Sequence, residues 1–243
     1  MAKLLHVITV DASLQRLERV KALLQGLAAP TTGVEVMALA GGPSDLEHYA
    51  HEHEAVALMM ARVPAAVREM AIDAVSIGCF YDPGVRALRE RLGIPVVGVG
   101  EASMHLASLL GHRFSVLVGR KKWIPLMSDT ALRYGFERRI ASWRAIERTV
   151  AQLQADPEAA FQAMVTQAEI AVRDDRAEVI VLGCAAMEGA AQRLAERIGV
   201  PVVDPVVAAF KLAEMLGDLR CRTGLSISRR YDYEPPPTQA GAG

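Results

Sequence analysis

The chain has 243 residues, 51% of them apolar and 23% charged, which is the composition of a globular protein with a substantial core. Its 27 basic and 28 acidic residues nearly cancel, which argues against a surface for nucleic acid or an anionic membrane. No apolar run approaches the roughly 20 residues that span a bilayer, so we expect neither nucleic-acid nor membrane partners.

Apolar, β-branched runs alternate with longer helical patterns along the chain, which is typical of parallel α/β structure. The pattern predicts two sets of four strands, at Leu4–Val10, Val34–Leu39, Ala74–Gly78 and Val96–Val99, and then at Phe114–Val118, Glu137–Ala141, Val179–Gly183 and Val202–Asp204. Asp82-Pro83 and Asp156-Pro157 each combine a capping residue with a proline, and so predict helix starts.

The two sets of strands predict two pseudo-symmetric lobes, each a four-stranded parallel sheet flanked by helices, with the active site in the cleft between them. We expect residues 1–99 plus about 206–230 to form the N-terminal lobe, and residues 100–205 the C-terminal lobe. Residues 231–243 lack the apolar side chains that a core needs, so we expect a disordered tail there.

A cysteine follows a glycine at the end of the third strand of each set. Cys79 ends the run Ile-Asp-Ala-Val-Ser-Ile-Gly-Cys, and Cys184 ends the run Ala-Glu-Val-Ile-Val-Leu-Gly-Cys. A lone cysteine is more often a buried apolar side chain, but two at equivalent strand ends of a repeat favour a functional pair. Ligands bind outside the carboxyl ends of parallel strands, so we expect the two thiols to face one cleft. Opposed thiols suit moving a proton from one face of a carbon to the other.

The loop after the first predicted strand contains Asp11 and Ser13. These side chains either point into the cleft, where they contact substrate or orient a thiol, or cap the following helix. The segment Gly119-Arg120-Lys121-Lys122-Trp123 also leaves two interpretations open, because its cations suit either a polar substrate or a solvated loop.

The sequence predicts no metal site and no nucleotide cofactor. His48, His51 and His53 are close in sequence, but the third falls off the helical face that the first two share. No segment rich in cysteine or histidine completes a site, so a solvated helix is favoured. No phosphate-binding glycine motif follows a strand. The beginning of the sequence lacks signal-peptide anatomy and the three cysteines have no framework spacing, so we expect reduced thiols and a cytoplasmic location. We also expect a homo-oligomer.

Six stretches of the chain are distinctive: Gly-Cys-Phe-Tyr-Asp-Pro-Gly at 78–84, Pro-Val-Val-Gly-Val-Gly-Glu-Ala at 95–102, Arg-Phe-Ser-Val-Leu at 113–117, Trp-Ile-Pro at 123–125, Val-Leu-Gly-Cys-Ala at 181–185 and Pro-Val-Val-Asp-Pro at 201–205. They resemble the hydantoin and allantoin racemases of the aspartate/glutamate racemase superfamily, over about residues 70 to 230. The resemblance implies cofactor-independent racemisation of a small molecule, most readily a 5-substituted hydantoin or allantoin.

The resemblance also implies a two-base mechanism for Cys79 and Cys184. One thiolate removes the proton α to a carbonyl, and the opposite thiol delivers a proton to the other face. Backbone N–H groups at Phe80-Tyr81 and Ala185-Ala186 are expected to stabilise the enolate-like charge, which makes these four residues substrate-binding candidates.

The first loop departs from the family pattern. Hydantoin racemases usually carry an Asn-Pro-Asn-Thr-like stretch where this chain has Thr-Val-Asp-Ala-Ser at 9–13. An aspartate followed closely by a serine looks more like the first loop of amino-acid racemases. Racemisation of aspartate or glutamate is therefore the alternative activity. A non-catalytic ligand-binding protein, or a thiol redox protein that forms a reversible disulfide, is the alternative from another class.

Overall fold

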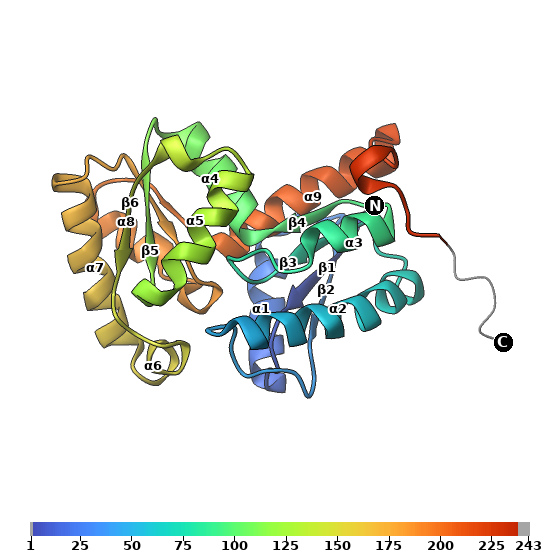
Figure 1. Ribbon diagram of the computed structural model, residues 1–243, viewed down its shortest axis with the longest axis horizontal. Helices are drawn as coiled ribbons and strands as arrows, with labels where there is room; N and C mark the ends of the chain where they lie inside the picture. The colour runs from blue at the N-terminus through green and yellow to red at the C-terminus, as the bar shows by residue number, and fades with distance from the viewer. Residues whose placement is uncertain (1, 238–243) are drawn as a thin grey trace.

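The computed structural model describes residues 2–237 and arranges them as two lobes side by side (Figure 1). The first lobe contains a parallel sheet of order β2-β1-β3-β4, and the second a parallel sheet of order β6-β5-β7-β8. The predicted α/β fold with two four-stranded parallel sheets is confirmed. The strands are β1 (Lys3–Ile8), β2 (Gly33–Ala38), β3 (Ala74–Ile77), β4 (Val96–Gly98), β5 (Phe114–Val118), β6 (Ile140–Ala145), β7 (Val179–Leu182) and β8 (Val202–Val203).

Helices pack around both sheets (Figure 1). In the described part of the chain they are α1 (Leu14–Leu27), α2 (Tyr49–Glu69), α3 (Val85–Leu92), α4 (Val99–Leu110), α5 (Ile124–Arg133), α6 (Val150–Ala155), α7 (Pro157–Arg173), α8 (Ala191–Ile198) and α9 (Pro205–Thr223). Short 3-10 turns are η1 (Lys121–Trp123), η2 (Glu137–Arg139), η3 (Ala185–Met187) and η4 (Tyr231–Tyr233). Within residues 2–237, none of the helices has the length and apolar character needed to cross a membrane.

Two helices exchange between the lobes. Helix α4 follows β4 of the first sheet but packs on β7 and β8 of the second, and α9 follows β8 but packs on β1, β3 and β4. The two helices also pack against each other. This exchange supports the division into residues 1–99 with about 206–230 and residues 100–205, which stays a prediction.

The strands of the second sheet separate two apolar cores. Side chains alternate between the faces of a strand, so Val179 and Val181 of β7 join a core that is continuous with the first lobe. Ile180 and Leu182 join a second core, which lies against α7 and α8. The face of the second sheet that packs against α4 therefore shares one apolar core with the first lobe. This shared core holds the strand ends of the two lobes in position relative to each other.

Strand β6 begins later and runs longer than the predicted strand Glu137–Ala141. Ser142 and Arg144 of β6 interrupt the apolar pattern from which the strand was predicted, but both side chains have hydrogen-bond partners in the fold. The Arg144 guanidinium donates to both carboxylate oxygens of Asp175, at 2.7 and 2.6 Å, and the Ser142 hydroxyl donates to the same carboxylate at 2.5 Å. A contact between distant segments therefore extends the strand beyond the reach of a local pattern.

Helix α3 begins at Val85 after Gly84, which is left-handed with φ of 69°, and Asp82 is not its cap. The Asp82 carboxylate instead accepts hydrogen bonds from the backbone N–H groups of Gly100 (2.8 Å) and Glu101 (2.7 Å), in the first turn of α4. The prediction that Asp82 caps α3 is therefore wrong. Its carboxylate caps α4, the helix that follows the next strand, β4.

The segment predicted as a disordered tail from residue 231 begins with η4. Tyr231–Tyr233 forms a 3-10 turn, and Arg89 of α3 donates to the hydroxyl of Tyr233 at 3.4 Å. Just before this turn, Arg229 donates to the carbonyl oxygens of Arg89 and Glu90 at 3.1 and 2.6 Å. These bonds hold a segment that lacks a core of its own. Residues 238–243 of the predicted tail lie outside the described residues.

Candidate active site

Both cysteines leave their sheets through the same backbone arrangement. The N–H of Gly78 donates to the carbonyl of Val7 on the neighbouring strand at 2.9 Å, and Gly183 donates to the carbonyl of Leu117 at 2.7 Å. A Cβ on Gly78 would lie 2.9 Å from the first oxygen, and one on Gly183 would lie 2.6 Å from the second. Only glycine permits such an approach, so the Gly-Cys repeat follows from the geometry of the strand ends.

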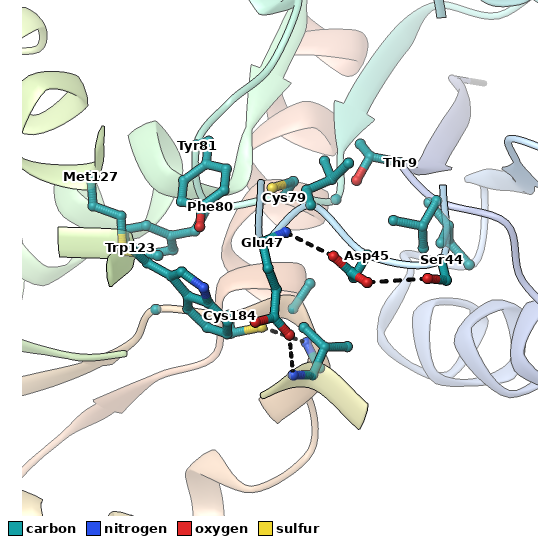
Figure 2. A pocket seen from close by; sticks show the side chains of 18 of the residues that line it. Thr9, Ser44, Asp45, Glu47, Cys79, Phe80, Tyr81, Trp123, Met127 and Cys184 are labelled. Atoms are coloured by element: carbon teal, nitrogen blue, oxygen red, sulfur yellow. Dashed lines mark hydrogen bonds between the residues drawn. The ribbon is translucent and has the colours of Figure 1, made fainter. Parts of the chain in front are cut away.

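Cys79 and Cys184 line one pocket where the lobes meet (Figure 2). The pocket has a cavity volume of about 60 Å³. Loops that follow β1, β2 and β3 supply one side, and loops that follow β5 and β7 supply much of the other. Its walls are Ile8, Thr9, Val10, Arg16, Ser44, Asp45, Leu46, Glu47, Gly78, Phe80, Tyr81, Trp123, Met127, Val150, Gly183, Ala185 and Ala186.

Four of the predicted substrate-binding residues lie in this pocket, and two do not. Phe80, Tyr81, Ala185 and Ala186 are part of the wall, as Figure 2 shows for the first two. Asp11 and Ser13 are exposed and are not among the lining residues.

The Ser13 side chain accepts a hydrogen bond from the N–H of Arg16 at 3.3 Å and caps α1. Of the two roles that the sequence left open for this serine, the structure therefore supports the helix cap.

The sequence interpretation missed the loop after β2. Ser44, Asp45 and Glu47 from this loop line the pocket, as do Arg16 of α1 and Trp123 of η1. A signal was present, because the segment Gly-Gly-Pro-Ser-Asp at 41–45 directly follows a predicted parallel strand, and such loops form ligand sites. Arg16 carries no comparable signal, because only the packing of α1 brings it to the pocket.

The two carboxylates of this loop are bound by other protein groups. Glu47 accepts from Arg120 of the second lobe at 3.0 Å and from the N–H of Val150 at 2.8 Å. Asp45 accepts from the N–H of Glu47 at 3.0 Å and is bonded to the ring of His51 at 3.1 Å. Burial would raise the pKa of Asp45, but these hydrogen bonds lower it below its ordinary value. Glu47 thus ties the loop to the second lobe across the pocket.

Two of the three histidines near α2 form local contacts, whereas the His48 ring is bonded to the Lys122 ammonium of the second lobe at 2.7 Å. His51 binds Asp45, and the His53 ring is bonded to the carbonyl of Tyr49 at 2.7 Å. Among residues 2–237, no group of three or more histidine, cysteine, aspartate or glutamate side chains is arranged to hold a metal ion.

The two thiols differ in their electrostatic surroundings. Burial raises the pKa of Cys79 far above its ordinary value, and it raises the pKa of Cys184 to about 11. The backbone N–H of Tyr81 opposes the shift at Cys79, and the N–H of Ala186 opposes it at Cys184, where it lies 3.4 Å from Sγ. Both N–H groups therefore stabilise thiolates, in addition to the role toward substrate that the sequence predicted for them.

Arg16 acts on Cys184 and on the buried ring of His6. Its positive charge lowers the pKa of Cys184, whereas no cation is among the main influences on Cys79. Burial first, and Arg16 second, lower the pKa of His6 to about 4, so that ring is neutral near pH 7. The Nε atom of Arg16 is itself buried without a hydrogen-bond partner among the described residues. Of the two pocket thiols, Cys184 is therefore the one that ionises first as the pH rises.

Replacing Arg16 with glutamine is expected to slow alkylation of Cys184 by iodoacetamide at pH 9 by about threefold or more, because the thiolate is the reacting form. Peptide mapping by mass spectrometry separates this cysteine from Cys79 and Cys221. Arg19→Gln on the same helix is the matched control, because Arg19 is paired with Glu188 at 3.3 Å and is absent from the pocket. Equal rates in both variants would show that Arg16 does not tune this thiol.

Comparisons with known proteins identify the family of the chain. The Asp/Glu/Hydantoin racemase family model matches residues 5–213. The hydantoin racemase of Pseudomonas sp. strain NS671 is 32% identical over 238 residues, which cover 98% of this chain and 94% of that protein.

Two solved structures are also similar. The allantoin racemase of Pseudomonas fluorescens superposes with a TM-score of 0.88 at 34% identity, covering 99% of this chain and 100% of that one. The allantoin racemase of Klebsiella pneumoniae superposes with a TM-score of 0.91 at 30% identity, covering 100% of this chain and 97% of that one. The chain belongs to the Asp/Glu/hydantoin racemase family and is a racemase, an isomerase.

Proposed function

We propose that this racemase interconverts the enantiomers of a 5-substituted hydantoin or of allantoin, with Cys79 and Cys184 transferring protons at opposite faces of C5 and no cofactor taking part. The observation that carries the proposal is that two thiols, at equivalent strand ends of the two lobes, line one small pocket. Relatives named hydantoin racemase and allantoin racemase support the choice of ring.

In the proposed reaction one cysteine, as thiolate, removes the proton from C5. The electrons of the C–H bond move toward the adjacent ring carbonyl, whose oxygen gains negative charge. The thiol on the other side then gives its proton to the opposite face of C5, and the carbonyl re-forms. The enantiomer bound decides which cysteine acts as the base, so each turnover leaves the two thiols with exchanged protonation states.

The charges around the pocket favour a ring that carries no ammonium group. A free amino acid would bring a cation that needs a carboxylate partner. The two carboxylates of the wall, Asp45 and Glu47, already accept hydrogen bonds from the protein. An uncharged ring amide requires only hydrogen bonds, and the apolar walls of Phe80 and Trp123 suit a planar ring.

A racemisation screen tests this proposal. Purified protein without added cofactor is expected to abolish the circular dichroism of one enantiomer of a 5-substituted hydantoin or of allantoin, and to leave that of L-aspartate and L-glutamate unchanged. Loss of the amino-acid signal alone would instead establish the alternative activity. Counting free thiols before and after mild oxidation tests the redox alternative, which predicts loss of two thiols through a disulfide between Cys79 and Cys184.

A further inference from the structure

We propose that Trp123 is a further catalytic residue, whose indole N–H donates a hydrogen bond to the substrate carbonyl oxygen that gains negative charge. The inference rests on the proposed function and names a group that acts on the reacting atoms. Trp123 is 3% exposed and lines the pocket with both cysteines. Among the described residues, its Nε1 atom has no hydrogen-bond partner. A buried donor without an acceptor costs stability, so its retention in a pocket points to a ligand as the acceptor.

The backbone of the second lobe fixes the orientation of the indole. Trp123 lies in η1, the first element after β5, and its backbone N–H donates to the carbonyl of Arg120 at 3.0 Å. The six-membered edge of the ring rests on Gly119, where an added Cβ would lie 2.3 Å from two ring carbons. With that edge held against glycine, the nitrogen lies on the edge of the ring that faces the interior of the pocket (Figure 2).

Both carboxylates in the pocket wall already accept hydrogen bonds from other protein groups. Glu47 lines the same pocket as Trp123, but one of its carboxylate oxygens accepts from Arg120 and the other from Val150. Asp45 accepts from the N–H of Glu47 and binds the ring of His51. A ligand carbonyl supplies the acceptor that the protein does not.

The reaction places charge where such a donor acts. When a thiolate removes the C5 proton, the electron pair of the C–H bond delocalises onto the adjacent carbonyl, and its oxygen becomes enolate-like. An N–H donor at fixed orientation binds this oxygen more strongly than the neutral carbonyl, and so it stabilises the transition state more than the bound substrate. The indole keeps its own proton throughout, because the two thiols carry out both proton transfers.

Trp123→Phe removes the donor and keeps an aromatic ring. Loss of one such donor is expected to lower kcat by about 100-fold to 1,000-fold and to change KM by less than about threefold. The chain offers a matched control, because its only other tryptophan is Trp143, on β6 and outside this pocket. Trp143→Phe is expected to keep the wild-type kcat. A Trp123→Phe enzyme with the wild-type kcat would overturn the inference.

A second measurement uses the unaltered protein. Its ¹H–¹⁵N spectrum contains two indole N–H signals, which the two variants assign. Saturation with 5,5-dimethylhydantoin, a ring that lacks the C5 proton and cannot turn over, is expected to move the Trp123 signal downfield and leave that of Trp143 unchanged. A Trp123 signal that stays in place while the ring binds would refute the contact. Wild-type protein that racemises no hydantoin and no allantoin would instead overturn the proposed function itself.

Discussion

Replacing either Cys79 or Cys184 with serine is expected to lower the racemisation rate by at least about 1,000-fold, because a serine hydroxyl ionises far less readily than a thiol and cannot act as the base. In the proposed mechanism each thiol is needed in every turnover, since one removes the proton and the other supplies its replacement. The loss is therefore expected in both directions of the reaction and in both variants. Polarimetry or circular dichroism with each enantiomer as the starting substrate measures it.

The third cysteine provides the control for this experiment. Cys221 lies exposed on α9 and outside the pocket, so Cys221→Ser is expected to racemise at the wild-type rate. Full activity in Cys79→Ser or in Cys184→Ser would contradict the two-base assignment. Activity lost in only one of them would leave a single cysteine as the base and require another group on the opposite face.

Replacing Asp82 with alanine is expected to lower the free energy of unfolding by about 2–4 kcal/mol, because two backbone N–H groups at the start of α4 then lose their acceptor. Asp82 is buried, and its backbone N–H, which alanine retains, donates to the carbonyl of Cys79 at 2.9 Å. Urea denaturation near pH 7 measures the change. Asp129→Ala, at an exposed position of α5, is the matched control and is expected to unfold like the wild type.

The pH dependence of this effect has a definite sign. Burial raises the pKa of Asp82 to about 7 in the folded protein, against the opposing influence of the two N–H donors. In the unfolded chain an aspartate ionises near pH 3.9. Between these two values the folded state binds the proton more strongly. The contribution of Asp82 to the free energy of unfolding is therefore greatest at low pH and falls as the pH rises toward 7.

Asp82→Asn cannot ionise and is expected to lack this part of the pH dependence. The difference in unfolding free energy between wild type and variant is therefore expected to change between about pH 4 and pH 7. A difference that stays constant across that range would show that Asp82 has the same pKa in the folded and unfolded states.

The sequence predicted the features that depend on local pattern. Alternating β-branched runs identified the strands, and the duplication of Gly-Cys at two strand ends placed Cys79 and Cys184 in equivalent positions. Both Gly-Cys steps follow from a close backbone approach to the neighbouring strand, so a local motif marks them. Asp156-Pro157 also predicted its helix correctly, since Asp156 caps α7 within its own segment.

The predictions that failed concern features that depend on contacts between segments distant in the sequence. Asp82 was expected to cap the next helix in the sequence, but its carboxylate lies against α4, which follows a further strand. Arg144 lies in the part of β6 beyond the predicted strand, and its partner Asp175 is distant in the sequence. Arg16 reaches the pocket through the packing of α1, and Glu47 through the packing of the loop after β2. The local sequence around each residue does not predict which groups it contacts there.

The initial fate of deuterium tests the central claim most directly, namely that two thiols act at opposite faces of one carbon. An enantiopure 5-substituted hydantoin is incubated with the enzyme in D₂O, and both enantiomers are separated early in the reaction and analysed by mass spectrometry. The two-base account predicts deuterium at C5 of the product enantiomer and almost none in the recovered substrate, because the thiol that donates is not the one that accepted the proton. Equal deuterium in both enantiomers from the start would contradict it.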